Sequence, residues 1–402
     1  MTIRKGSLSL VFVITIFAAL PPFAIDAYMP AFKEIGSYFS VSDHDLTKSI
    51  STYFLGFAIG MLIWGAITDR FGRRKPLIVG IIIYLASSIL CSTSVNYNML
   101  LIMRFIQGLG DSSGAIISMA ILRDCYKGNR LTKMMSTVTM IFMIAPIVAP
   151  IIGSFIIYLT NDWKNIFHFL TIYGIVLLIL SFFIPETINQ KKKEVSIFSN
   201  VRTYIKHFQN LPFILFTIVI GLLFAAMFSF ISSSSILIIN YLKLGYIQYC
   251  LLFGFNMLGV ILSSYYVRKR VNKNNQYKVI LTYFLVAILF LIINIILSNL
   301  YNNIYVFIVF NLLATGCFVS TSILITSIAL NTLNFGYGSG NAIASLIKFS
   351  FGSLASYLIS SNELKSLQVD ISIQQLFFIV LSFILFLWVT RNIYFSANKK
   401  NK

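Results

Sequence analysis

Apolar residues fill twelve runs of about 20 residues along the chain, and short polar stretches separate these runs. Crossing the roughly 30 Å hydrocarbon core of a bilayer takes a helix of about 20 mainly apolar residues. Each run therefore predicts one transmembrane helix, and together they predict an all-α membrane protein with twelve such helices. The runs cover residues 8–30, 47–68, 76–95, 99–122, 134–158, 165–184, 212–235, 247–267, 278–298, 303–330, 339–360 and 373–394.

The composition excludes other broad classes of protein. Of the 402 residues, 58% are hydrophobic and only 11% are charged, whereas a soluble domain carries about 25% charged residues. An intrinsically disordered chain would contain fewer apolar residues and more charged residues than this chain does. The first run follows Arg4 and Lys5. It is longer than the apolar core of a signal peptide and has no A-x-A cleavage site, so we interpret it as a span.

The placement of the basic residues, whose excess gives the chain a net charge of +19, predicts its orientation in the membrane. In a soluble protein such an excess of basic residues would suggest nucleic-acid binding. Here 24 of the 31 basic residues fall in alternate loops and the two termini, five fall on the opposite side, and Arg104 and Lys348 lie inside runs. Cytoplasmic loops are the ones enriched in Lys and Arg. We therefore expect both termini in the cytoplasm, a bacterial cytoplasmic membrane as the location, and no nucleic-acid partner.

The longest connection between runs, residues 185–211, divides the chain into an N-terminal half, residues 1–184, and a C-terminal half, residues 212–402. Two six-helix pseudo-repeats are typical of secondary transporters, whose binding sites lie near the membrane midplane. Four cysteines and three histidines are scattered without the spacing of a metal or catalytic site. We expect no metal, no cofactor and no enzymatic activity.

Four ionisable residues lie well inside the predicted spans: Asp26, Arg104, Asp111 and Lys348. A charge there costs at least about 2.5–3.5 kcal/mol, so it is paired, faces water or has a function. Asp26 and Arg104 lie about one turn from the same membrane face, which would allow them to pair. Asp111 projects from the same helix face as Arg104, about 10 Å deeper. The group is either a proton relay or a structural salt bridge between spans one and four.

Prolines are concentrated in the first half of the chain. Pro21 and Pro22 precede Asp26 in the first run, and Pro146 and Pro150 lie in the fifth. Proline removes a helical hydrogen bond, and broken helices in membranes are tolerated where they line a cavity. We expect both spans to be interrupted at these positions.

The loop between the second and third runs contains a motif with two glycines and several charges, G-A-I-T-D-R-F-G-R-R-K at residues 65–75. It resembles motif A of the major facilitator superfamily, with Gly65, Asp69, Arg70, Gly72 and Arg73 at motif positions. The resemblance implies a latch of the outward-open state, in which Asp69 pairs with Arg123 and meets the N-terminus of the eleventh span.

Two further segments are similar to motifs of that superfamily. Residues 100–108 around Arg104 resemble motif B, whose buried arginine is implicated in proton coupling. Residues 145–154 resemble the antiporter motif C, with Ala149 and Ser154 in place of two glycines. The resemblance implies conformational gating by Ala149, Pro150 and Gly153. Finally, I-D-A-Y-M-P-A-F at residues 25–32, and residues 338–345, are similar to Bcr/CflA-type drug efflux proteins.

We therefore expect a proton-coupled transporter that exports small organic molecules or drugs by alternating access. We expect it to work as a monomer, and its partners to be a small-molecule substrate, protons and the lipid bilayer. Asp26, Arg104 and Asp111 are the proton-coupling candidates. The alternatives are a transporter of a specific metabolite (a sugar, amino acid or nucleoside) and a non-transporting membrane sensor. The substrate-binding candidates are Tyr28, Gln107, Phe224, Phe228, Asn256, Asn311 and Lys348.

Overall fold

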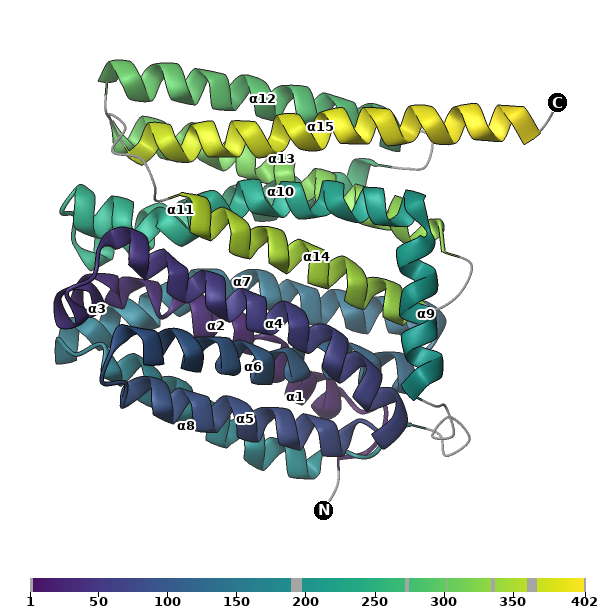
Figure 1. The fold of residues 1–402 in the computed structure, drawn as a ribbon, viewed down its shortest axis with the longest axis horizontal. Coiled ribbons are helices and arrows are strands. Elements are labelled where there is room, and N and C mark those ends of the chain that lie inside the picture. Colours follow the sequence, from purple (N-terminus) through teal and green to yellow (C-terminus); the bar gives the residue numbers. More distant parts are fainter. Residues whose placement is uncertain are drawn as a thin grey trace. The chain divides into compact units, whose positions relative to one another are not determined.

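The computed structural model describes residues 3–188, 197–271, 275–301, 303–333, 337–359 and 367–400, and these residues are almost entirely helical, without a β-strand among them (Figure 1). Part of the predicted connection between the halves, residues 189–196 with the basic residues Lys191–Lys193, lies outside the described residues. The rest of that connection is not simply a loop, because α9 (Ile197–Gln209) occupies most of it.

The elements follow the predicted runs closely. In the N-terminal half they are α1 (Leu8–Ala18), α2 (Leu20–Asp26), the 3₁₀ turn η1 (Met29–Ala31), α3 (Phe32–Phe39), α4 (Asp43–Phe71), α5 (Arg74–Ser92), α6 (Tyr97–Cys125), α7 (Gly128–Thr160) and α8 (Lys164–Phe183). In the C-terminal half they are α10 (Leu211–Ser235), the π-helical η3 (Ile236–Tyr241), α11 (Tyr246–Arg270), α12 (Gln276–Tyr301), α13 (Ile304–Asn331), α14 (Tyr337–Leu358) and α15 (Leu367–Lys400).

Ten helical stretches among the described residues are long and apolar enough to cross a membrane. They coincide with all predicted spans except the fifth and the eleventh, and these two are helical as well. The fifth lies in α7, whose described apolar part is Ile144–Thr160. The eleventh is α14, a helix of 22 residues that carries Lys348 among glycines and serines, which lowers its mean hydropathy.

The first span is broken twice. α1 ends at Ala18, and Pro21 and Pro22 stand in the first turn of α2, where a missing amide hydrogen removes no helical bond. A second break follows Asp26 and separates α2 from η1. The interruption predicted from these prolines is therefore confirmed.

The interruption predicted for the fifth span is wrong. α7 runs from Gly128 to Thr160 as one helix, with Pro146 and Pro150 inside it. Each proline removes one backbone hydrogen bond, but helical dihedrals persist on both sides, and such sites bend a helix without ending it.

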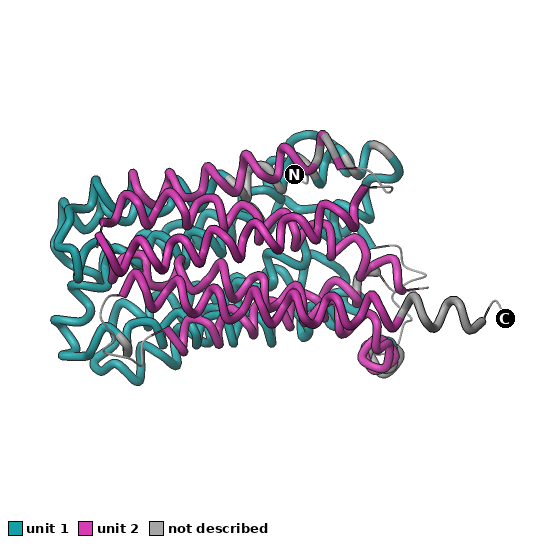
Figure 2. The backbone as a smooth tube through the Cα atoms, turned by 90° about the horizontal axis from the view of Figure 1, so that it is seen from above, with its two compact units in different colours: residues 1–203, 238–250 teal, residues 204–237, 251–402 magenta. Residues whose placement is uncertain are grey.

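The chain forms two compact units (Figure 2). Unit 1 comprises Met1–Thr203 and Ile238–Cys250, and within it α4 and α5 pack against α6, α5 packs against α8, and α7 packs against α1 and α2. Unit 2 comprises Tyr204–Leu237 and Leu251–Lys402, and within it α10 packs against α13, α14 and α15, while α12 packs against α13 and α15.

A glycine sets the distance between α4 and α6 in unit 1. A Cβ atom added to Gly108 of α6 would come within 2.0 Å of the carbonyl oxygen of Tyr53 on α4. Small residues allow transmembrane helices to approach this closely. The close contact brings Tyr53 beside Arg104, one turn before Gly108 on α6.

Candidate functional site

Arg104 lies between two aromatic rings in unit 1. Its side chain is completely buried. Its guanidinium carbon is 4.4 Å from the ring centroid of Tyr28, which follows α2, and 4.5 Å from that of Tyr53 on α4. A desolvated cation–π contact contributes about 2 kcal/mol. Two of them contribute about 4 kcal/mol, which is comparable to the minimum cost of about 2.5–3.5 kcal/mol for a charge inside a span.

Hydrogen bonds engage only one nitrogen of the Arg104 guanidinium, because Nε and Nη2 have no partner among the described residues. Its Nη1 donates to the carbonyl oxygen of Ala24 at 3.1 Å and to Oε1 of Gln107 at 2.6 Å, and Nε2 of Gln107 donates to Oγ of Ser88 at 2.7 Å. The Ala24 carbonyl is available because the amide of Tyr28 turns to Ile25 at the end of α2. The amide group of Gln107, a predicted substrate contact, is thus engaged at both ends within the protein.

Tyr53 connects Arg104 to the second charged residue of α6. Its hydroxyl donates a hydrogen bond to Oδ2 of Asp111, while its ring faces the guanidinium of Arg104. Asp111 is completely buried, and its Oδ1 has no hydrogen-bond partner among the described residues. The hydroxyl of Tyr28 donates to Oγ of Ser49 on α4 at 3.0 Å.

The ion pair predicted between Asp26 and Arg104 is absent. Within the described part of the chain, no carboxylate oxygen lies within 4.0 Å of Arg104, and the side chain of Asp26 makes no hydrogen bond. Asp26 is the last residue of α2 and is 5% exposed. The prediction was wrong because the break after α2 presents the Ala24 carbonyl, and not the Asp26 carboxylate, to the guanidinium.

Tyr28 and Tyr53 contact Arg104, Tyr53 also bonds to Asp111, and Asp26 stands on α2, whose Ala24 carbonyl accepts from Arg104. These residues (Asp26, Arg104, Asp111, Tyr28 and Tyr53) are called the Arg104 cluster below and include two carboxyl groups and one cation. With both carboxyl groups ionised it carries one net negative charge in a buried place, and with one of them protonated it is neutral. Because a buried net charge is costly, the arrangement favours binding one proton.

The segment that resembles motif C packs against the break next to Asp26. A Cβ atom on Gly153 of α7 would lie 2.1 Å from the carbonyl oxygen of Ala27, so only glycine allows this approach. Ala149 is completely buried one turn earlier. The single thiol hydrogen of Cys250 can be donated to the carbonyl oxygen of Pro150, 3.6 Å from Sγ, or to Oγ of Ser154, 3.3 Å from Sγ.

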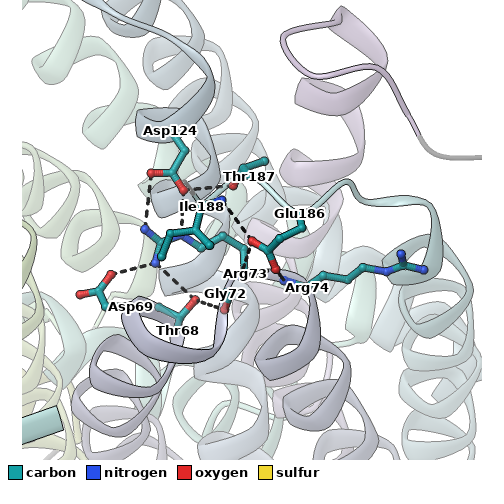
Figure 3. A network of polar contacts seen from close by, with 9 residues as sticks. All are labelled: Thr68, Asp69, Gly72, Arg73, Arg74, Asp124, Glu186, Thr187 and Ile188. Atoms are coloured by element: carbon teal, nitrogen blue, oxygen red, sulfur yellow. Dashed lines mark hydrogen bonds and ion pairs between the residues drawn. The ribbon is translucent and has the colours of Figure 1, made fainter. Parts of the chain in front are cut away.

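At the junction of α4 and α5, Arg73 is the centre of a polar network (Figure 3). Its Nη1 is 2.8 Å from Oδ1 of Asp69, and its Nε is 2.8 Å from Oδ2 of Asp124 at the end of α6. Burial lowers the pKa of Arg73, but its bonds to the two carboxylates outweigh that effect, so its pKa lies above the ordinary value. Asp69 is half exposed and Asp124 is mostly buried, so the pair with Asp124 contributes more to holding Arg73.

Glu186, just after α8, caps α5 in the same network. Its carboxylate accepts from the amide of Arg73 at 2.9 and 3.0 Å, from that of Arg74 at 3.4 Å and from that of Ile188 at 3.1 Å (Figure 3). An anion at a helix N-terminus satisfies free amides and meets the positive end of the helix dipole. Gly72 has φ +90°, and a Cβ atom there would lie 2.2 Å from Oε2 of Glu186, so this turn requires glycine.

The pair expected between Asp69 and Arg123 is also absent, because Arg73 takes Asp69 in the same turn and Arg123 is exposed. Among the other motif residues, Gly65 is buried within α4, and Arg70 is exposed with its guanidinium carbon 5.3 Å from the ring centroid of Phe71. Asp124 and Glu186 were not selected from the sequence. Their signal was available, since each is an acidic residue beside the end of a predicted span.

The substrate-binding candidates of unit 2 fall into two groups. Lys348 lies against Phe224, with Nζ 4.5 Å from the ring centroid, and Phe224 in turn contacts Phe228 at a centroid distance of 4.8 Å. Asn256 on α11 and Asn311 on α13 are completely buried, and their side-chain amide atoms have no hydrogen-bond partner among the described residues.

Comparison with known proteins decides the family. The model of the Major Facilitator Superfamily matches residues 11–360. The chain belongs to the major facilitator superfamily. The twelve-helix fold predicted from hydropathy is that of this superfamily, and the chain is a membrane transporter and not an enzyme.

Several individual proteins resemble this superfamily member. An uncharacterized transporter of Bacillus subtilis is 28% identical over 365 residues, 89% of this chain and 90% of that protein. A bicyclomycin resistance protein homolog of Haemophilus influenzae is 29% identical over 273 residues, 67% of this chain and 68% of that protein, which confirms the resemblance to Bcr-type proteins. The crystal structure of a D-xylose–proton symporter has a TM-score of 0.70 at 17% identity and covers 93% of this chain and 96% of its own.

Proposed function

We propose that this transporter is a proton-coupled antiporter that exports small organic molecules or drugs by alternating access. We expect it to be a monomer in a bacterial cytoplasmic membrane, and its basic loops support an orientation with both termini in the cytoplasm. The relative that is named for bicyclomycin resistance supports export of a drug-like substrate.

The observation that carries this proposal is the charge balance of the Arg104 cluster. Asp26 and Asp111 are both buried, and neither makes an ion pair with Arg104, the cation of the cluster, among the described residues. One proton neutralises the cluster, so protonation and deprotonation alternate as the cluster gains and loses contact with each side of the membrane. A bound substrate biases the conformations only through its different affinity for each.

Gating is assigned to the two motif segments. The Arg73 network, with Gly65, Asp69, Arg70, Gly72 and Arg123 around it, would hold one conformation and release it in the other. Ala149, Pro150 and Gly153 would transmit movement of α7 to the break beside Asp26, because Gly153 touches Ala27 there.

The direct test is substrate flux into or out of proteoliposomes with an imposed pH gradient, using a panel of drug-like compounds. In Asp26→Asn the carboxyl group can no longer bind or release a proton. We expect at least a ten-fold loss of gradient-driven flux while exchange of substrate across the membrane without a gradient persists.

Asp370→Asn is the matched control, because it makes the same substitution at the first turn of α15, outside the cluster. We expect its flux to stay within two-fold of the unmodified protein. Full gradient-driven flux in Asp26→Asn, with the protein still inserted, would refute coupling through this residue.

A further inference from the structure

Lys348 is a basic residue inside a span that the Arg104 cluster does not explain. It lies mid-way along α14, ten residues before the end of that helix at Leu358. Ten residues of α-helix span about 15 Å. Its side chain is half-buried, and its Nζ faces the rings of Phe224 at 4.5 Å and Phe349 at 5.2 Å. The amine is therefore held against these two rings, and the residue is not fully enclosed.

The second half of the chain offers this amine no counter-charge at its own depth. From residue 204 to the C-terminus the sequence has two acidic residues, Glu363 and Asp370. Glu363 lies outside the described residues, and Asp370 stands in the first turn of α15. Within the described part of the chain, no carboxylate oxygen is within 4.0 Å of Lys348.

The rings around Lys348 are fixed by close packing of α10 against α14. A Cβ atom on Gly352 would lie 2.7 Å from Cε1 of Phe224. Phe224 also contacts Phe228 at a centroid distance of 4.8 Å and Phe349, edge-on, at 5.3 Å. The face of a phenyl ring attracts a cation but supplies no full negative charge. The site therefore combines a built apolar wall with a cation that still lacks an anion.

We propose that Lys348, Phe224, Phe228 and Phe349 form a substrate subsite, the Lys348 subsite, for small organic anions that carry an aromatic or other apolar group. The carboxylate or sulfonate of such a compound pairs with the amine, and its apolar part packs on the phenylalanines. This inference rests on the proposed transport function and narrows its substrate class to compounds with an anionic group.

The test compares two probes of nearly equal shape, 1-naphthoate and its neutral amide, 1-naphthamide. Binding is measured by calorimetry on the full chain in lipid nanodiscs. We expect naphthoate to bind at least ten-fold more tightly than naphthamide. In Lys348→Met this preference disappears because only the binding of naphthoate weakens, and in Lys348→Arg most of the preference returns.

Lys278→Met is the control, since Lys278 is an exposed lysine of α12 in the same unit, and it should leave both affinities within two-fold. Equal affinity for the two probes in the unmodified protein, or an equal loss of both in Lys348→Met, would overturn the subsite. A third result would also overturn the subsite: Lys348→Met alone lowers the stability of the protein, and a second change, Asp26→Asn or Asp111→Asn, restores it. Lys348 would then be an internal counter-ion.

Failure of the transport proposal gives a different result. If no pH gradient drives flux of either probe or of any drug-like compound, the antiport proposal falls, while the binding preference for naphthoate is still measured separately. Conversely, gradient-driven flux of neutral compounds that is unchanged in Lys348→Met, together with no preference for naphthoate, removes the subsite and leaves antiport intact.

Discussion

Tyr53 performs two tasks with one side chain. Its ring lies against Arg104, and its hydroxyl donates to Asp111. Phenylalanine keeps the first contact and removes the second, so the two tasks can be separated. The residue thereby offers a way to examine Asp111 without changing a charge.

For Tyr53→Phe we expect a maximal rate of gradient-driven flux about ten-fold lower, with the half-saturating substrate concentration changed less than two-fold. The reason is that a buried acceptor left without its donor costs about 1–3 kcal/mol, and 1.4 kcal/mol corresponds to about ten-fold in rate. Tyr173→Phe, which also loses one hydroxyl bond in unit 1, to the carbonyl of Ile16, should transport normally. Equal losses in both variants would show that the Tyr53 hydroxyl has only a general packing role.

At the scale of residues, the sequence predicted which charged residues are buried better than it predicted how they pair. Asp26, Arg104 and Asp111 stood out because charges are rare in apolar runs, and all three are buried. Their partners did not follow from spacing. Arg104 bonds to a backbone carbonyl that a helix break exposes, and Arg73 takes the carboxylate expected for Arg123. Both outcomes depend on local backbone geometry.

At the scale of elements, the broken first span and α7 form one packed unit. α2 ends at Asp26, and Gly153 of α7 touches the carbonyl of Ala27 in the break. The position of this contact means that α7 cannot shift along the break without a change in the surroundings of Asp26. Prolines predicted the break in the first span correctly. They misled in α7, because proline removes a bond without dictating that neighbouring bonds fail.

Gly153→Ala should lower the melting temperature by a few degrees and reduce gradient-driven flux strongly. The added methyl group would lie 2.1 Å from the Ala27 carbonyl oxygen, and overpacking of this kind costs about 1–3 kcal/mol. Gly36→Ala of α3 is the control, because its nearest neighbour would be a side-chain carbon of Leu46 at 3.4 Å. A Gly153→Ala protein as stable and active as Gly36→Ala would contradict a tight contact at Ala27.

At the scale of the whole molecule, hydropathy was sufficient to predict which segments form the long helices. Ten spans were recognisable by length and apolar content alone, and the other two are helices in the expected places. The bilayer explains this success, since every backbone polar group within it must be bonded inside a helix or a closed barrel. Lys348 shows the limit of the method, because the residue that lowers the apolar content of α14 is also one of its functional candidates.

The distribution of basic residues gives a prediction for the complete chain. A fluorescent protein fused after residue 402 should fluoresce, and alkaline phosphatase fused there should be inactive, because the basic loops predict that both termini lie in the cytoplasm. Phosphatase fused after residue 243, in a loop with little positive charge, should be active. The reverse pattern would invert the predicted topology.

The network around Arg73 also anchors the start of the connection that leaves the N-terminal half. Ile188 is the last described residue before that connection continues, and its amide is held by the same carboxylate that caps α5. A pull on the connection would therefore act first on the hydrogen bonds of Glu186, before it acts on any helix. Through Glu186 it would then act on the turn at Gly72. Shortening the connection just beyond residue 188 would strain the hydrogen bonds of this carboxylate first, and lengthening the connection there would relieve that strain.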